Sequence, residues 1–125
     1  MTGVQTCALP ISGDACLQAL ARLLRASVHR AGDMVARYGG EEFVVMLGDS
    51  KPVDAIALAE SFRAAVEAMV VEVDGMSLRM TASFGVAYVV PDGATSAQAL
   101  LAAADKALYQ AKQSGRNRVC VADSL

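Results

Sequence analysis

The chain has 125 residues, of which 54% are hydrophobic and 19% are charged, and its formal net charge is −2. This composition is typical of a globular domain with one core and excludes a disordered chain. The charge balance gives no basic surface for nucleic acid, and no apolar run approaches the ~20 residues of a membrane-spanning helix. The cysteines Cys7, Cys16 and Cys120 lack the spacing of metal ligands and are expected to be buried thiols of a cytosolic protein.

The first eleven residues, MTGVQTCALPI, show neither helical nor strand periodicity and offer no helix cap. Read back as codons from a GTG start, they resemble a common sequencing-library adaptor whose last base opens the codon of Ser12. We interpret residues 1–11 as such a scar, with a short, poorly ordered arm as the alternative. Both interpretations predict that this segment packs against nothing. Residues 12–125 are then one partial domain, a fragment of a longer protein.

A helix is expected from Asp14 onward, because apolar residues recur on one face and Gly32 suits its C-terminal end. The apolar positions are Leu17, Leu20, Leu24 and Val28. Two strands are expected next, near residues 34–38 and 42–48. The glycine pair between them can adopt the positive φ that a tight hairpin requires.

Pro52 lies near the start of a second amphipathic helix, whose apolar stripe continues to Met69. An Asp-Gly pair at positions 74–75 indicates a hairpin turn, and residues 77–90 are expected to form one long strand.

Thr95 and Gln98 have the spacing of a capping box for a third helix, which ends at Gly115. Residues 118–122 form a last short strand, and Phe84 and Tyr109 are expected in the core. The sequence therefore predicts one α/β domain in which helices cover a sheet.

The segment RYGGEEF, residues 37–43, puts two glycines and two carboxylates at the turn between two apolar strands. Glycine lets a ligand approach the backbone closely. Glu41 and Glu42 offer hard oxygen ligands, which Mg²⁺ accepts together with phosphate oxygens. The turn thus suggests a site for a metal-bound nucleoside triphosphate. On spacing alone, a charged turn that only solvates a hairpin is the simpler interpretation.

RYGGEEF followed by VVML resembles the hallmark of the GGDEF family, the diguanylate cyclases, in its GGEEF form. Further stretches match that family in order: GD at 13–14, RAGD at 30–33, TASFGVA at 81–87 and ADKALYQAKQSGRNRV at 104–119. The resemblance spans residues 13 to about 121. It implies a palm-like α/β nucleotidyl-cyclase fold, with an antiparallel-containing sheet covered by helices.

The resemblance also implies an activity, the condensation of two GTP into cyclic di-GMP with release of pyrophosphate. Each domain of a homodimer would hold one GTP, and an upstream sensor domain would usually drive the pairing. The domain would be cytoplasmic, and the resemblance allows the full-length parent protein to be anchored in a membrane through sequence upstream of this domain. Two cations would neutralise the charge that develops as a ribose 3′-hydroxyl attacks the α-phosphorus.

By position in the family motif, Glu41 is implied as a ligand of Mg²⁺ or Mn²⁺ and as a candidate base for the 3′-hydroxyl, with Glu42 as a supporting carboxylate. Asp14 would accept hydrogen bonds from guanine, and Lys112 and Arg116 would bind phosphate. The implied substrate-binding positions are Asp14, Gly39, Gly40, Lys112 and Arg116. Without the resemblance, the two cations would be interpreted as a solvated basic face.

Arg30 and Asp33 match the family's inhibitory site, where the arginine would clamp a phosphate of the product and stack on guanine. Without the resemblance, they would be interpreted as an ion pair at a helix end. Ser61 stands where many members carry an arginine that completes this site, so product inhibition is expected to be weaker.

The sequence departs from the family upstream, where the helix DxLTGLxNRR and the strand ending in DxDxFKxxND are absent. The chain is therefore expected to lack its first strand and helix, a metal-binding Asp, a lysine near the phosphates and a guanine-reading Asn. Loss of one placed charge typically costs orders of magnitude in rate, so the fragment is expected to be inactive alone. Two functions remain open: an enzyme, or a catalytically inactive module that binds cyclic di-GMP through Arg30 and Asp33. The intact GGEEF motif favours the enzyme.

Overall fold

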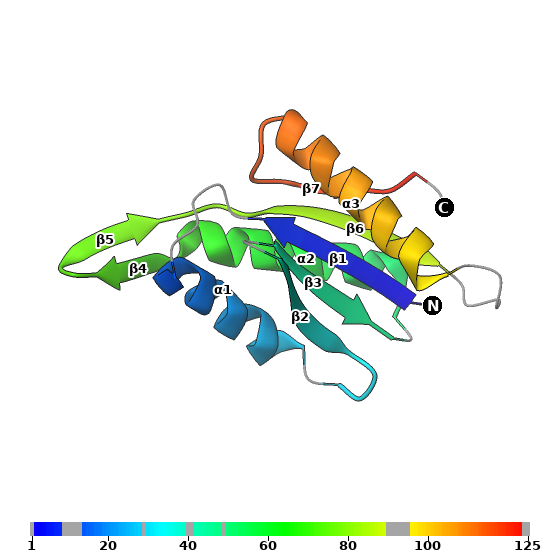
Figure 1. The fold of residues 1–125 in the computed structure, drawn as a ribbon, viewed down its shortest axis with the longest axis horizontal. Helices are drawn as coiled ribbons and strands as arrows, with labels where there is room; N and C mark the ends of the chain where they lie inside the picture. The colour runs from blue at the N-terminus through cyan, green and yellow to red at the C-terminus, as the bar shows by residue number, and fades with distance from the viewer. Residues whose placement is uncertain are drawn as a thin grey trace.

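The computed structural model describes residues 2–8, 14–28, 30–39, 42–48, 50–89 and 96–123. In this part of the chain, strands and helices follow one another as drawn in Figure 1: β1 (Thr2–Ala8), α1 (Asp14–Ser27), β2 (Met34–Gly39), β3 (Glu42–Leu47), α2 (Pro52–Ala68), β4 (Val70–Val73), β5 (Met76–Arg79), β6 (Ser83–Val89), α3 (Ala97–Gln113) and β7 (Val119–Val121). No helix among these residues is long and apolar enough to cross a membrane.

The main sheet has the strand order β2-β3-β1-β6-β7. Its strands are antiparallel neighbours except for β7, which runs parallel to β6. Strands β4 and β5 form a separate two-stranded hairpin that extends away from the main sheet (Figure 1). The predicted α/β architecture, with an antiparallel-containing sheet covered by helices, is thus confirmed.

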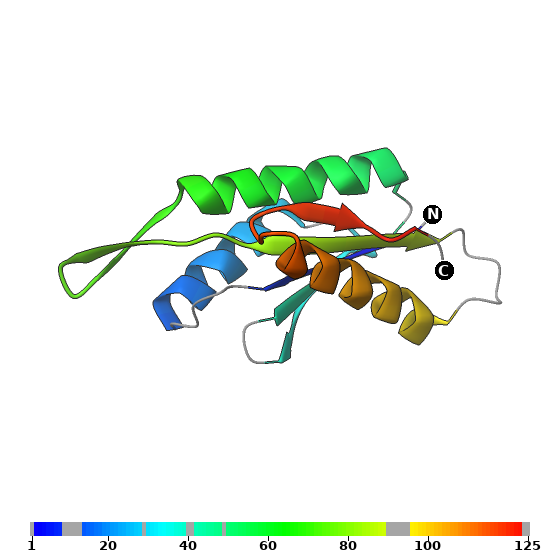
Figure 2. The same ribbon diagram turned by 90° about the horizontal axis from the view of Figure 1, so that it is seen from above.

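Helices pack on both faces of the main sheet, with α2 on one side and α3 on the other (Figure 2). Successive residues of β3 contribute to the apolar clusters on opposite faces of the sheet. Phe43 and Val45 join the apolar cluster formed with α1 and α2, whereas Val44 and Met46 pack against the cluster beneath α3. Both faces are therefore covered, which leaves the ends of the strands and the loops beyond them as places for a site.

Strand β1 contradicts the expectation that residues 1–11 pack against nothing. Thr2–Ala8 pairs along its whole length with β6, and Gly3–Ala8 pairs with β3 on the other side. The slot between two strands with unpaired backbone groups accepts any extended segment, since ladder hydrogen bonds use backbone atoms only. Periodicity did not predict this strand, because TGVQTCA has neither the alternation of a half-buried strand nor the continuous apolar run of a fully buried one.

The sequence analysis expected the first strand of the sheet to be lacking, whereas the structure has β1 at the centre of the sheet.

Three smaller expectations need correction. The long strand predicted over residues 77–90 is divided into β5 and β6, with a break at residues 80–82. Thr95 lies outside the described residues, and the N-cap of α3 is Ser96, whose Oγ accepts a hydrogen bond from the Ala99 N–H at 3.1 Å. Tyr109 is 63% exposed and is not a core residue, whereas Phe84 is fully buried as expected.

Candidate functional site

The β2–β3 hairpin carries the GGEEF motif at its tip. Gly39 pairs with Glu42 across the hairpin, after a shift in register that follows Arg37. Gly40 and Glu41 lie outside the described residues, so their predicted roles remain predictions. Glu42 begins β3, and its side chain is about one third exposed. The hairpin thus places at least one motif carboxylate at the end of a buried strand.

Lys112 approaches this carboxylate from the last turn of α3. Its Nζ lies 3.9 Å from Oε1 of Glu42, and the lysine side chain is 28% exposed. The two residues come from different elements, β3 and α3, and are 70 positions apart in the sequence. The structure therefore brings together two of the predicted site residues, one acidic and one basic.

A second carboxylate acts on the same lysine from within α3. Burial raises the pKa of Asp105, and the positive charge of Lys112 partly opposes that increase. Within the described part of the chain, Oδ1 of Asp105 is buried and has no hydrogen-bond partner. Lys112 is therefore attracted by two carboxylates, Glu42 at the hairpin and Asp105 on its own helix, although burial opposes the charged form of Asp105.

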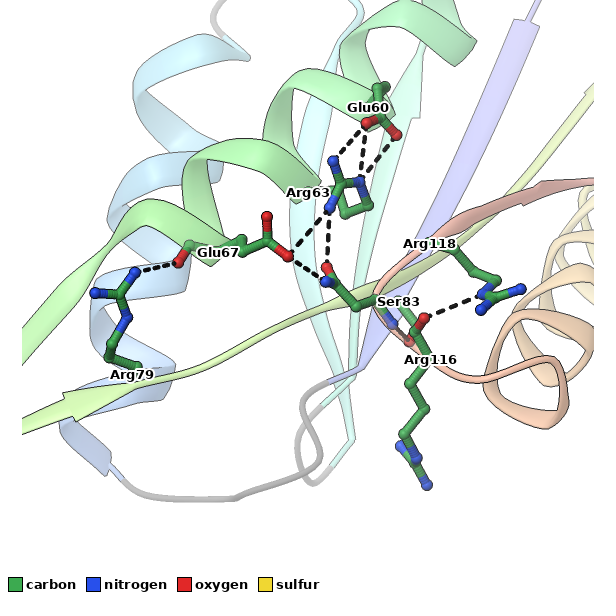
Figure 3. Close-up of polar contacts among 8 residues, drawn as sticks. Glu60, Arg63, Glu67, Arg79, Ser83, Arg116 and Arg118 are labelled. Carbon is green, nitrogen blue, oxygen red and sulfur yellow. Dashed lines mark hydrogen bonds and ion pairs between the residues drawn. The ribbon is translucent and has the colours of Figure 1, made fainter.

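Arg116 lies beyond the end of α3, four residues after Lys112. It is exposed, its φ is +63°, and its backbone N–H donates to the carbonyl oxygen of Ala111 at 2.9 Å. With Gly115 at φ +125° this bond forms the left-handed ending that commonly closes helices. The guanidinium extends away from α2 (Figure 3).

Asp14 is the first residue of α1 and is exposed. An acidic residue in the first turn is favoured by the helix dipole whether or not it binds a ligand. Residues 9–13 before it lie outside the described part, so its predicted contact with guanine remains a prediction.

Arg30 and Asp33 form an ion pair, with 2.9 Å between Nε and Oδ2, and their predicted role in an inhibitory site remains a prediction. Asp33 is almost buried, its side chain 3% exposed, and its Oδ1 accepts a hydrogen bond from the Gly48 N–H at 2.9 Å. Arg30 is 58% exposed and also donates from Nη2 to the Gly48 carbonyl oxygen at 3.2 Å. Asp33 therefore fixes the turn before β2 to the end of β3, whereas the arginine is accessible to a ligand.

This pair lies in the wall of a cavity of about 490 Å³. The lining residues are Ser27, Arg30, Asp33, Leu47, Ser50, Lys51, Asp54, Ala55 and Leu58. Lys51 and Asp54 were missed by the sequence reasoning, although a lysine just before the Pro52 helix start was visible there. Ser61 does not line the cavity, and its hydroxyl donates within the helix to the Leu58 carbonyl oxygen at 2.7 Å.

A further polar network was also missed (Figure 3). Glu60, Arg63 and Glu67 follow one another at helical spacing on α2, and Arg63 donates from Nη1 to Oδ1 of Asn117 at 3.0 Å. The hydrogen bond from Arg63 lowers the pKa of the Glu60 carboxyl, and Glu60 raises the pKa of Arg63 in turn. The spacing on α2 is readable in the sequence, but its partner 54 positions away is not.

Comparison with known proteins places these features in a wider group. Residues 11–118 match the family described as "Diguanylate cyclase, GGDEF domain". The chain is 44% identical over 108 residues to diguanylate cyclase A of Treponema denticola, covering 86% of this chain and 29% of that protein. It is 46% identical over 110 residues to diguanylate cyclase DgcM of Escherichia coli K12, covering 88% of this chain and 25% of that protein. The chain thus spans between a quarter and a third of the length of these relatives.

A solved structure extends the comparison to the fold. The GGDEF domain of DgcB from Caulobacter crescentus, crystallised in complex with c-di-GMP, superposes with a TM-score of 0.90 at 25% identity, covering 98% of this chain and 76% of that one. A superposition that covers 98% of 125 residues cannot leave out the seven residues of β1. The family match in sequence, by contrast, begins only at residue 11. Strand β1 therefore shares the relative's fold and lies outside the family's sequence match.

Proposed function

Because the chain belongs to the GGDEF family of diguanylate cyclases, we propose that it is the GTP-binding domain of an enzyme that condenses two GTP molecules into cyclic di-GMP and releases pyrophosphate. The observation that carries the proposal is the approach of Lys112 to Glu42 at the GGEEF hairpin. A lysine beside a carboxylate at 3.9 Å is held by a weak, exchangeable contact. A triphosphate bound at the turn would draw the ammonium group onto its oxygens, with Arg116 as a second phosphate ligand.

Mg²⁺ or Mn²⁺ would accompany the triphosphate. Mg²⁺ is usually held by one or two carboxylates together with phosphate oxygens and water, and Glu41 and Glu42 supply this donor type. In the described part of the chain, Glu42 supplies one such carboxylate at the start of β3. When bound, the metal would neutralise charge on the phosphates, and Glu41 would be its principal ligand in this chain.

The complete reaction would need two domains. Each would hold one GTP, and a homodimer would place the two nucleotides face to face, with an upstream sensor domain of the parent protein controlling the encounter. Gly39 and Gly40 would let the triphosphate lie against the turn, and Asp14 would accept from guanine.

We propose further that the chain as it stands does not complete the reaction. The segment Thr2–Ala8 occupies the centre of the sheet but contains no Asp or Glu, and it lies outside the family match. Electrostatic catalysis depends on charges placed before the reaction begins, so a central strand without carboxylates supports the fold without supplying its share of the site. This is consistent with residues 1–11 being foreign to the domain.

Binding of GTP with Mg²⁺ tests the proposed site without requiring turnover. Isothermal titration on the intact chain is expected to show binding that Lys112→Gln weakens about tenfold, the loss of roughly one charge-assisted contact. Lys106→Gln is the matched control, because it removes the same charge from the exposed part of the same helix. Equal losses in the two variants would show that only general charge matters and would contradict the assignment of Lys112.

The second candidate function is a module that binds cyclic di-GMP without making it. The cavity around Arg30 favours it, because an accessible guanidinium there can contact a phosphate in bidentate fashion. Lys51, at the cavity wall, adds a second cation. Titration of cyclic di-GMP into the chain and into Arg30→Ala is expected to show a 10- to 100-fold loss, from about 1.5–3 kcal/mol per hydrogen bond to a charged group. Equal affinity would leave Arg30 with a structural role alone, in its contacts with Asp33 and Gly48.

A further inference from the structure

The loop between α3 and β7 has an unusual backbone. Gly115, Arg116 and Asn117 all have positive φ, at +125°, +63° and +48°. Glycine takes this conformation freely and asparagine tolerates it, but arginine is disfavoured there because its Cβ crowds the following carbonyl. A run of such residues persists only when its surroundings fix it.

Backbone contacts fix one side of this loop to the start of β6. The N–H of Asn117 donates to Oγ of Ser83 at 3.1 Å, and Ser83 is only 2% exposed. The N–H of Phe84 donates to the carbonyl oxygen of Arg118 at 2.9 Å. The loop is thus hydrogen-bonded to a buried strand at two successive residues.

The side chain of Asn117 fixes the other side of the loop to α2. Its Oδ1 accepts from Nη1 of Arg63 at 3.0 Å, and its Nδ2 donates to the carboxylate of Glu67. Arg63 is itself held by Glu60, with 2.6 Å between Nη2 and Oε1, and its side chain is only 18% exposed. The side-chain oxygen and nitrogen of Asn117 are therefore both hydrogen-bonded to charged side chains of α2. We call Arg63 and Asn117 the loop clamp.

The residue next to the clamp is the predicted phosphate ligand. Figure 3 shows the guanidinium of Arg116 extending away from α2, where Arg63 lies. We propose that the loop clamp positions Arg116, holding it in the left-handed conformation that presents its guanidinium to phosphate groups. This inference rests on the proposed function, in which Arg116 binds the triphosphate.

The chemistry of the loop supports a positioning role over a purely structural one. Gly115 already provides the left-handed ending of α3, so the helix needs no second strained residue to terminate. Glycine at position 116 would adopt φ +63° without strain. An arginine held there by a charged network places one particular side chain, with its charge directed to solvent.

The test measures the order of Arg116 and the binding of inorganic pyrophosphate separately, on the intact chain. Nitrogen-15 relaxation of the Arg116 amide and Nε reports order, and calorimetry reports pyrophosphate affinity. Arg63→Gln is expected to loosen Arg116 and to weaken pyrophosphate binding about tenfold. Asn117→Gly, which keeps the positive φ but removes the amide, is expected to do the same. Arg79→Gln is the matched control, because Arg79 donates to the backbone carbonyl of Glu67 and lies outside the clamp.

The outcomes separate this inference from the proposed function. An Arg116 that stays ordered in both clamp variants overturns the positioning role. An Arg116 that becomes mobile while pyrophosphate affinity is unchanged also overturns it, since the clamp then only holds a loop. If the wild-type chain binds no pyrophosphate, the proposed phosphate site is wrong, and the positioning role of the loop clamp is wrong with it. Thermal unfolding of each variant confirms that it is folded before either measurement is interpreted.

Discussion

Gly85 offers a sharp test of how α3 reaches the site, because a methyl group there has no space. Helix α3 crosses β6 at this residue, and a Cβ built on Gly85 would lie 2.2 Å from the carbonyl oxygen of Ala104 and 2.3 Å from the nitrogen of Leu108. Both are backbone atoms of α3, so no side chain can rotate away. Ordinary van der Waals separation would return only after the helix had moved outward by about 1 Å.

We therefore predict that Gly85→Ala is strongly destabilising. Overpacking a core costs about 1–3 kcal/mol, and a collision between two backbones falls at or above the top of that range. About 3 kcal/mol is a large fraction of the 5–15 kcal/mol that holds a typical domain together. Urea unfolding followed by circular dichroism measures the difference, with an unchanged m-value as the sign that both proteins unfold in one step.

Gly48→Ala is the matched control for this substitution. A Cβ on Gly48 would lie 3.3 Å from the carbonyl oxygen of Gly32, a tight contact that a shift of a few tenths of an ångström relieves. We expect a loss of less than about 1 kcal/mol there. A Gly85→Ala protein within about 0.5 kcal/mol of the wild type would show that α3 does not pack on β6 as closely as described, and the placement of Lys112 beside Glu42 would lose its support.

Three further predictions concern the turn before β2, the charge within α3 and the central strand. Asp33→Ala should lower the free energy of unfolding in urea by about 1–3 kcal/mol, because the Gly48 N–H loses its acceptor. Arg30→Ala should lower it by less than about 1 kcal/mol, since that side chain is largely exposed. Equal losses in the two variants would contradict the structural role of the aspartate. Burial raises the pKa of Asp105 above its unfolded value, so the folded chain binds protons more readily and loses stability as pH rises from about 4. Asp105→Asn should therefore raise the melting temperature at pH 7 and give little advantage below about pH 4, and a gain that does not depend on pH would refute the reasoning. Deletion of residues 1–8 should prevent cooperative unfolding, because β3 and β6 would each lose a neighbour; a deleted chain that still melts in one sharp transition would show that the central strand is dispensable.

The helices and hairpins of this fold were predictable from local pattern. The stripe through Leu17, Leu20 and Leu24 predicted α1, and these three residues are all buried. The glycine pair and the Asp-Gly pair predicted two hairpins, and strands flank both positions. These features depend on residues a few positions apart, whose periodicity is set by the helix and the strand themselves.

The features that sequence did not predict depend on contacts between distant segments. Strand β1 forms because β3 and β6 leave a gap between them, which no pattern within Thr2–Ala8 could indicate. The amide of Asn117 finds its partner on α2 only after both elements have packed on the sheet. The approach of Lys112 to Glu42 likewise follows from the packing of α3, and the family resemblance alone had suggested it.

The most direct test of the account is a turnover assay on two versions of the chain. One is the chain as it stands, and in the other a strand and loop of the family pattern DxDxFKxxND replace residues 1–11. Cyclic di-GMP and pyrophosphate are measured by chromatography after incubation with GTP and Mg²⁺. We predict no product from the first, product from the second, and loss of that product when Glu41→Ala is added. Product from the unaltered chain would contradict the claim that its central strand supports the fold without completing the site.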